Sequence, residues 1–173
     1  MLPAHTVGLL ALTLGVLSGC SRANPLSVPK PTVAPTAITS VSLSQGQCFW
    51  NTCPVFSVTI NADGKVNYVG VEHVRQDGAR SLRVPQKDFE KLAALIEQLD
   101  YFNRRDRYSS TEDGCTTIMS DQAFREFVVR RGVETKKVFY YLGCKGEFHD
   151  GADRLAEAIY DTTQVNDFVG LKP

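Results

Sequence analysis

The fold is indicated most clearly by residues 55–74, which read VFSVTINADGKVNYVGVEHV. At the start of this stretch, apolar and hydroxyl-bearing residues alternate in the order Phe56, Ser57, Val58, Thr59 and Ile60. A period of two is typical of a strand with one buried face. The turn Asn-Ala-Asp-Gly at 61–64 then leads into a second strand at 65–74, because Asn, Asp and Gly tolerate positive φ. The stretch therefore predicts a β-hairpin.

Four further segments show strand patterns. Apolar residues alternate with serines at 41–44, and a short strand is expected at 81–84. A second hairpin is predicted from strands at 124–130 and 135–142, which the turn at 131–132 joins.

Two segments show helical spacing instead. After Pro85, which suits the first turn of a helix, apolar residues recur on one helical face. These residues are Phe89, Leu92, Leu95, Ile96 and Leu99. A second helix is expected to begin near Asp150 and Asp153, because carboxylates are favourable at a helix N-terminus, and to end at about Thr163.

The predicted order is four strands, a helix, two strands and a helix. Antiparallel hairpins with helices on one side form two-layer α+β folds. We therefore predict an α+β two-layer sandwich, in which a mainly antiparallel sheet of about five or six strands carries two helices on one face.

Residues 1–19 are predicted to be a lipoprotein signal peptide. The run Leu17-Ser18-Gly19-Cys20 resembles the lipobox of bacterial lipoproteins, in which the chain is cut before the cysteine and Cys20 carries the acyl chains. The apolar stretch before it, Val7 to Leu17, is too short to span a bilayer, which takes about 20 residues, but fits a signal sequence. The alternative is an ordinary apolar N-terminus with a chance cysteine.

The predicted organisation continues with a Pro-rich tether at 20–39 and one α+β domain at 40–173. Half of the eight prolines lie in this tether, a composition that favours extended chain over a packed core. The residue after Cys20 is Ser21. In enterobacterial-type lipoproteins, an Asp at this position would indicate retention in the inner membrane. We therefore expect a lipid-anchored protein of the cell envelope, in the outer membrane and facing the periplasm.

The overall charge disfavours a nucleic-acid partner. The chain has 19 basic and 19 acidic residues, so it has no net field that would attract a polyanion. The expected partners are the membrane, through the lipid anchor, and an envelope protein or other periplasmic ligand.

The four cysteines after Cys20 are expected to form disulfides, because paired cysteines oxidise outside the cytosol. Three connectivities are open in principle. Cys48 and Cys53 flank a short loop, whereas Cys115 and Cys144 lie toward the open end of the second predicted hairpin. We therefore predict the pairs Cys48 with Cys53 and Cys115 with Cys144.

Two other roles for these cysteines remain open, but the spacing disfavours both. A zinc site would favour two short-spaced pairs, whereas Cys115 and Cys144 are far apart, and His149 is the only histidine near either pair. A thiol redox centre would resemble Cys-x-x-Cys at the start of a helix, but Cys53 is followed by Pro54 and a predicted strand. We predict no metal and no cofactor.

These cysteines also carry a resemblance to a known family. The matching features are the string CFWNTCPVFSVTI at 48–60, LDYF at 99–102, Tyr108 and YLGC at 141–144. Together they resemble the bacterial family called domain of unknown function 6438, from about residue 41 to 170. The family pattern is usually Cys-Phe-Gly-x-Cys-Pro, whereas here Trp50-Asn51 replaces the glycine and lengthens the loop. The resemblance implies the fold, but no activity.

The sequence shows no catalytic constellation, so we expect a protein that is not an enzyme. It has no nucleophile elbow, Gly-rich phosphate loop or HExxH motif. The favoured interpretation is a membrane-anchored periplasmic lipoprotein whose domain serves binding or structure. The alternative is an envelope thiol oxidoreductase, or another enzyme whose site the sequence does not reveal.

Two features are candidates for an interaction surface. Trp50, the only tryptophan, lies between Cys48 and Cys53 and could anchor a partner, although we favour its packing over the disulfide. The basic cluster of Arg104, Arg105 and Arg107 could face an anionic partner, although a solvated connection between helix and strand is the simpler interpretation.

Overall fold

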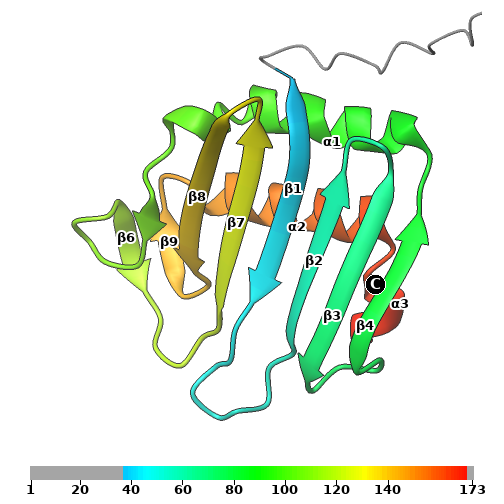
Figure 1. Ribbon diagram of the computed structural model, residues 1–173. Coiled ribbons are helices and arrows are strands. Elements are labelled where there is room, and N and C mark those ends of the chain that lie inside the picture. Colours follow the sequence, from blue (N-terminus) through cyan, green and yellow to red (C-terminus); the bar gives the residue numbers. More distant parts are fainter. Residues whose placement is uncertain (1–36, 171–173) are drawn as a thin grey trace, which may run out of the picture. The chain divides into compact units, whose positions relative to one another are not determined.

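The computed structural model describes residues 37–170. They form a seven-stranded sheet with two long helices behind one face (Figure 1), and a separate two-stranded ribbon. The strands are β1 (Ile38–Gln45), β2 (Val55–Asn61), β3 (Lys65–Glu72), β4 (Gly78–Arg83), β5 (Arg107–Tyr108), β6 (Cys115–Ile118), β7 (Phe124–Arg131), β8 (Glu134–Tyr141) and β9 (Cys144–Gly146). The helices are α1 (Gln86–Gln98), the 3-10 turn η1 (Tyr101–Asn103), α2 (His149–Thr163) and α3 (Asn166–Val169).

The strand order across the main sheet is β4-β3-β2-β1-β7-β8-β5. The first four strands form a meander, and β1 joins this meander to the β7–β8 hairpin. Leu43 of β1 lies opposite Val58 of β2 on one side and Phe127 of β7 on the other. Every pairing is antiparallel except the short parallel pairing of β5 with β8.

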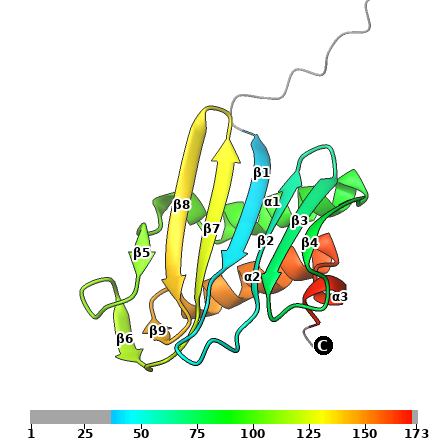
Figure 2. The same ribbon diagram turned by 60° about the horizontal axis from the view of Figure 1, so that its bottom comes forward.

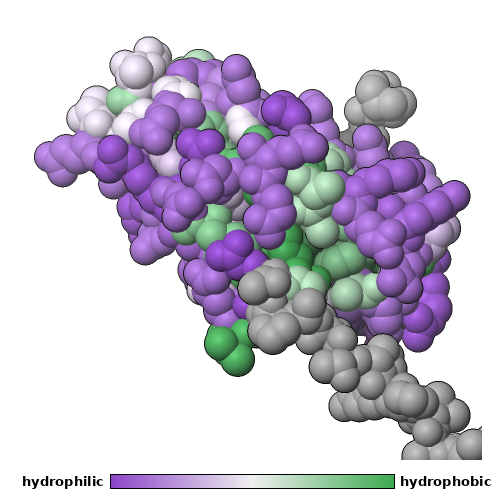
Figure 3. All heavy atoms as spheres, turned by 90° about the horizontal axis from the view of Figure 1, so that it is seen from above, coloured by the Kyte–Doolittle hydropathy of each residue, from purple (hydrophilic) through white to green (hydrophobic). Residues whose placement is uncertain are grey.

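The hydrophobic core lies between the sheet and the two helices. Alternate residues of each central strand are buried on the helix side, as the period of two predicts. Helices α1 and α2 close this layer with the buried faces of Leu92, Ile96, Leu155 and Ile159. Viewed from the end where β1 begins, hydrophobic residues gather between hydrophilic regions of the surface (Figure 3).

The α+β sandwich class is confirmed, but the predicted number of strands was too low. The main sheet has seven strands and β6 and β9 form a second sheet. The missed strands β5, β6 and β9 have two, four and three residues. Segments this short do not show enough alternation to be recognised.

Strand β1 begins at Ile38, so the folded part includes the last two residues of the predicted tether. The predicted signal peptide, Cys20 and the rest of the tether lie outside the described residues. Within residues 37–170, no helix is long and apolar enough to cross a membrane.

Candidate functional site

One end of the main sheet carries both disulfides. At this end β1 finishes, β2 and β7 begin, and β8 finishes (Figure 2). A row of paired residues, Phe56, Gln45, Arg125 and Tyr140, crosses the sheet there. We call this region the disulfide end.

Both predicted disulfides are confirmed. Cys48 pairs with Cys53, with their Cα atoms 5.6 Å apart, and Cys115 pairs with Cys144 at 5.2 Å. The second pair is buried and joins the strands of the β6–β9 ribbon. No group of three or more His, Cys, Asp or Glu residues in the described part of the chain could hold a metal ion.

The first disulfide closes an exposed aromatic loop between β1 and β2. Phe49 is 71% exposed and Trp50 is 72% exposed, and their rings meet edge to face with centroids 5.1 Å apart. The expectation that Trp50 packs into the protein over the disulfide was therefore wrong. The loop between Cys48 and Cys53 projects from the sheet. The two rings therefore contact each other and leave most of their surface in water. We call residues 46–54 the aromatic loop.

Hydrogen bonds fix the base of the aromatic loop. The Asn51 amide donates to the Cys48 carbonyl at 3.0 Å, and the Gln45 side chain donates to the Pro54 carbonyl at 3.1 Å. Gln47 also donates to the Glu72 carboxylate at the end of β3. Together with the disulfide, these bonds restrict the loop before any partner binds.

A partly buried polar cluster supports this loop from the helix side of the sheet. The Arg125 guanidinium donates to the Gln45 side-chain oxygen at 3.3 Å and forms an ion pair with Asp153 of α2, also at 3.3 Å. Tyr160 of α2 donates to the same Gln45 oxygen at 3.4 Å. The cluster thus connects the base of the aromatic loop to α2.

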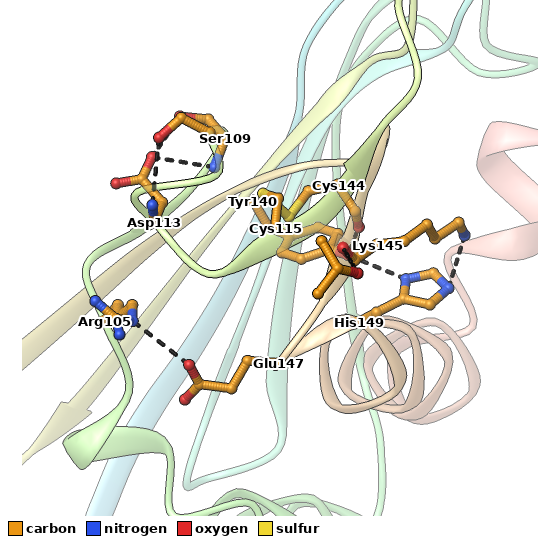
Figure 4. Close-up of a disulfide and its surroundings, with 11 residues drawn as sticks. Arg105, Ser109, Asp113, Cys115, Tyr140, Cys144, Lys145, Glu147 and His149 are labelled. Carbon is orange, nitrogen blue, oxygen red and sulfur yellow. Dashed lines mark hydrogen bonds and ion pairs between the residues drawn. A yellow bond between two sulfur atoms is a disulfide. The ribbon is translucent and has the colours of Figure 1, made fainter.

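The cluster continues to the second disulfide through His149 (Figure 4). Lys145 lies 2.6 Å from His149 Nε2, and an ammonium can only donate, so Nε2 accepts. The imidazole Nδ1–H then donates to the Tyr140 hydroxyl at 3.0 Å, and that hydroxyl donates to the Cys144 carbonyl. Burial raises the pKa of Tyr140 to about 12, so the hydroxyl stays protonated and can act as this donor.

The three arginines of the predicted basic cluster are already engaged in contacts within the domain. Arg104 donates to the Leu99 carbonyl at 2.8 Å and lies over the Phe148 ring. Arg105 pairs with Glu147 at 3.5 Å (Figure 4), whereas the Arg107 guanidinium lies 4.5 Å from the centre of the Phe139 ring. Arg104 is also 3.9 Å from the Glu147 carboxylate, so Arg104 and Arg105 share one acidic partner, whereas Arg107 lies on an aromatic ring.

The loop that leads into the second disulfide is also internally paired. Asp113 accepts hydrogen bonds from the Ser109 hydroxyl and amide (Figure 4), and these bonds lower the pKa of Asp113. This carboxylate therefore stabilises its own loop.

A family model matches residues 39–162, and its description is domain of unknown function (DUF6438). The chain belongs to this family. No curated protein matches the chain.

Sequence reasoning missed most of the polar cluster in this DUF6438 domain. Gln45, Arg125, Tyr140 and Asp153 come from three strands and a helix, and each lies in a pattern that by itself indicates only secondary structure. An available signal was the charged residue Arg125 at the first helix-facing position of β7, where the next two helix-facing residues, Phe127 and Val129, are apolar.

A hollow of about 460 Å³ lies away from the disulfide end of the DUF6438 domain, beside β5 and β8. Its lysines are already paired, Lys136 with Asp106 at 2.6 Å and Lys137 with Glu126 at 2.9 Å. These two ion pairs neutralise both acidic residues of the hollow, and its third basic residue, Arg107, lies over the Phe139 ring.

Proposed function

We propose that this protein is a membrane-anchored periplasmic lipoprotein whose DUF6438 domain is a non-catalytic binding module. In this proposal Cys20 carries the lipid, the Pro-rich segment after it acts as a spacer, and the aromatic loop contacts the partner. The run Leu17-Ser18-Gly19-Cys20 supports the anchor. The two disulfides are consistent with an oxidising compartment.

The exposure of Phe49 and Trp50 carries the binding part of the proposal. Two adjacent aromatic side chains in water forgo the free energy that their burial would give. A disulfide and hydrogen bonds already hold their loop, so little conformational entropy would be lost on binding. Rigid, exposed aromatic residues of this kind are frequent anchors of interfaces.

The aromatic loop also lies away from the point where the chain enters the domain. Ala37 precedes the first residue of β1, whereas the loop follows the last residue of that strand. An eight-residue strand separates the two points by about 25 Å. An anchor on the N-terminal side would therefore leave the aromatic loop accessible to a partner.

An envelope thiol oxidoreductase is the second candidate, because the Cys48–Cys53 disulfide lies in an exposed loop. Its context does not favour this role, since Cys53 leads into β2 and not into a helix N-terminus that would lower a thiol pKa. Replacing both cysteines by alanine separates the two candidates. A binding module would lose stability only, whereas an oxidoreductase would lose turnover of a model disulfide substrate.

The anchor is tested by intact mass of the chain extracted from membranes. We expect a mass that corresponds to cleavage before Cys20 plus acyl chains, and a Cys20→Ala variant that is recovered from the soluble fraction. An unmodified Cys20 in the wild-type chain would show that the anchor is wrong.

The binding role is tested by photo-crosslinking in cells. A benzophenone amino acid replaces Phe49, because irradiated benzophenone inserts into C–H bonds of any partner in contact with it. Irradiation of cells should give a discrete crosslinked species that disappears when Trp50→Ala is combined with the label. The matched control carries the label at Val133, a fully exposed residue of the β7–β8 turn at the other end of the sheet. Equal crosslinking from both positions would contradict a specific surface.

A further inference from the structure

We infer that the partner of the aromatic loop is a neutral glycan strand of N-acetylated sugars, which extends from this loop along the outer face of β1 and β2. The inference rests on the proposed binding function and adds the chemical class of the ligand. Three properties of the β1–β2 segment carry it: its lack of charge, its row of hydroxyl and amide groups, and its aromatic end.

The segment is uncharged, although charged residues make up 22% of the chain. From Pro31 to Ala62 the sequence contains no Asp, Glu, Lys or Arg. The solvated face of an antiparallel sheet usually carries charged side chains among its polar ones. A surface without charges offers no Coulombic attraction to an ionic ligand, and a neutral ligand can cover it without desolvating a charge.

The outer face of these two strands is formed by small polar side chains. They lie in cross-strand pairs: Ser40 with Asn61, Ser42 with Thr59, and Ser44 with Ser57. All six are partly exposed. The Ser42 and Thr59 hydroxyls are 2.8 Å apart and bond to each other. Because a hydroxyl has one donor and two acceptor positions, each retains capacity for the hydroxyls of a sugar.

The aromatic loop joins β1 to β2 beyond the end of the sheet (Figure 1), so it lies at one end of the strip that these six side chains form. The exposed rings of Phe49 and Trp50 provide apolar faces, on which the C–H face of a sugar ring can stack. Asn51 and Thr52 are exposed beside them and supply amide and hydroxyl groups. An acetamido substituent has a methyl group, one N–H donor and one carbonyl acceptor, so it matches this combination of apolar and amide surface.

Charged side chains lie on the two flanks of the strip. On the β7–β8 side Glu126 binds Lys137 at 2.9 Å, and at the end of β3 Glu72 accepts a hydrogen bond from Gln47. Lys137 neutralises Glu126, whereas the uncharged Gln47 leaves Glu72 with its charge, and Arg130 of β7 lies opposite Ser40. Charges therefore lie on the flanks and not on the strip itself. The strip is long and narrow, which suits a linear polymer.

The test measures binding of the N-acetylglucosamine hexamer and of the glucose hexamer to the full chain, in a detergent without a sugar headgroup. Trp50 is the only tryptophan, so its intrinsic fluorescence reports contact at the aromatic loop directly. Calorimetry measures the affinity of variants that lack this residue. We expect saturable binding of the N-acetylated hexamer, weaker binding of the glucose hexamer, and little change with added salt.

Two variants with a matched control locate the site. Trp50→Ala and Ser42→Lys should each weaken binding at least tenfold. Ser81→Lys is the control: Ser81 faces outward on β4 and, like Ser42, makes one side-chain hydrogen bond, to Asn67 at 2.9 Å. It should change the affinity by less than twofold. If Ser42→Lys and Ser81→Lys lowered the affinity equally, the proposal that the glycan binds along β1 and β2 would be wrong.

The outcomes separate this inference from the proposed function. If neither hexamer binds, or if an anionic uronic-acid hexamer binds as tightly as the N-acetylated one, the neutral glycan is overturned. Specific crosslinking from position 49 in cells would then still support a binding module with another partner. Absence of both glycan binding and crosslinking would overturn the two proposals together.

Discussion

Gly64 and Gly78 have nearly the same backbone conformation but different surroundings. Their φ values are +77° and +75°, in the left-handed region that disfavours other residues. A Cβ on Gly64 would lie 2.2 Å from the Val84 carbonyl oxygen, whereas nothing lies within 4 Å of a Cβ on Gly78. Substituting each glycine by alanine therefore distinguishes the cost of backbone strain, which both positions share, from the cost of a steric clash, which only Gly64 has.

We expect Gly78→Ala to lower the free energy of unfolding by about 1 kcal/mol, because only the left-handed conformation is penalised. Gly64→Ala should cost about 2 to 3 kcal/mol, since the chain must also move away from Val84. Urea denaturation of both variants measures the difference. Equal losses would mean that the turn can relax and that the contact with Val84 is unimportant.

The exposure of Trp50 shows a limit of reasoning from residue type. Tryptophan is mostly buried in proteins, and the neighbouring cysteines are apolar, so packing over the disulfide was a sound expectation. The position of the ring depends on the direction in which its loop leaves the sheet, and residues in other strands set that direction.

Among the elements, the two disulfides close loops of very different length. Cys48 and Cys53 are five positions apart, and Cys115 and Cys144 are 29 apart. In the chain-entropy model a longer closed loop restricts the unfolded chain more. The second disulfide also lies in the buried part of the β6–β9 ribbon.

We expect replacement of the first pair by alanine to lower the free energy of unfolding by about 2 kcal/mol, and replacement of the second pair by about 4 kcal/mol. Denaturation of the two double variants under identical conditions checks this order. The first variant should keep the fold and differ from wild type mainly at the aromatic loop, as amide hydrogen exchange would show. A larger loss from the first pair would contradict the expected order.

Arg125 forms part of the polar link between the sheet and α2, and its side chain is only 15% exposed. Its removal leaves the Gln45 oxygen and the Asp153 carboxylate without this donor. We expect Arg125→Ala to cost about 2 kcal/mol and to loosen the aromatic loop through Gln45. Arg130→Ala on the exposed side of the same strand should cost less than about 0.5 kcal/mol.

The comparison of Arg125→Ala and Arg130→Ala needs two measurements: urea denaturation for stability, and hydrogen exchange of residues 46–54 for the loop. Faster exchange in the Arg125 variant alone is the expected result. Unchanged exchange there would mean that the disulfide and Gln47 hold the loop without the polar cluster.

At the scale of the whole molecule, buried tyrosines should make the fold sensitive to alkali. Burial raises the pKa of five of them above the ordinary value of 10: Tyr68, Tyr101, Tyr108, Tyr140 and Tyr160. For Tyr140 the value is about 12. Above pH 10 the unfolded chain therefore releases protons that the folded chain retains.

The free energy of unfolding should then fall as pH rises from 10 to about 12, because the unfolded state binds fewer protons than the folded state. Urea midpoints across this range, with tyrosinate absorbance recorded in parallel, check the slope. Tyr140→Phe should show a shallower decline, since it removes one of these groups. A stability that does not change between pH 10 and 12 would contradict the burial argument.

The sequence by itself determined the longer strands and helices, the α+β class and the predicted pairing of cysteines. Alternation in β2 and helical spacing in α1 are local patterns, and the short loop between Cys48 and Cys53 limits the partners of each. Such features follow from residues close together in the chain.

Only the tertiary structure decided that β1 joins the meander to the β7–β8 hairpin. It also decided that hydrogen bonds of Arg125 and His149 connect the regions of the two disulfides. The exposure of Phe49 and Trp50 is likewise visible only there. The network brings together residues from β1, β7, β8 and α2. Their proximity results from packing of the whole sheet against its helices, and each local pattern is compatible with many such arrangements. For this reason the sequence predicted the framework of the domain, whereas the candidate binding surface became visible only in three dimensions.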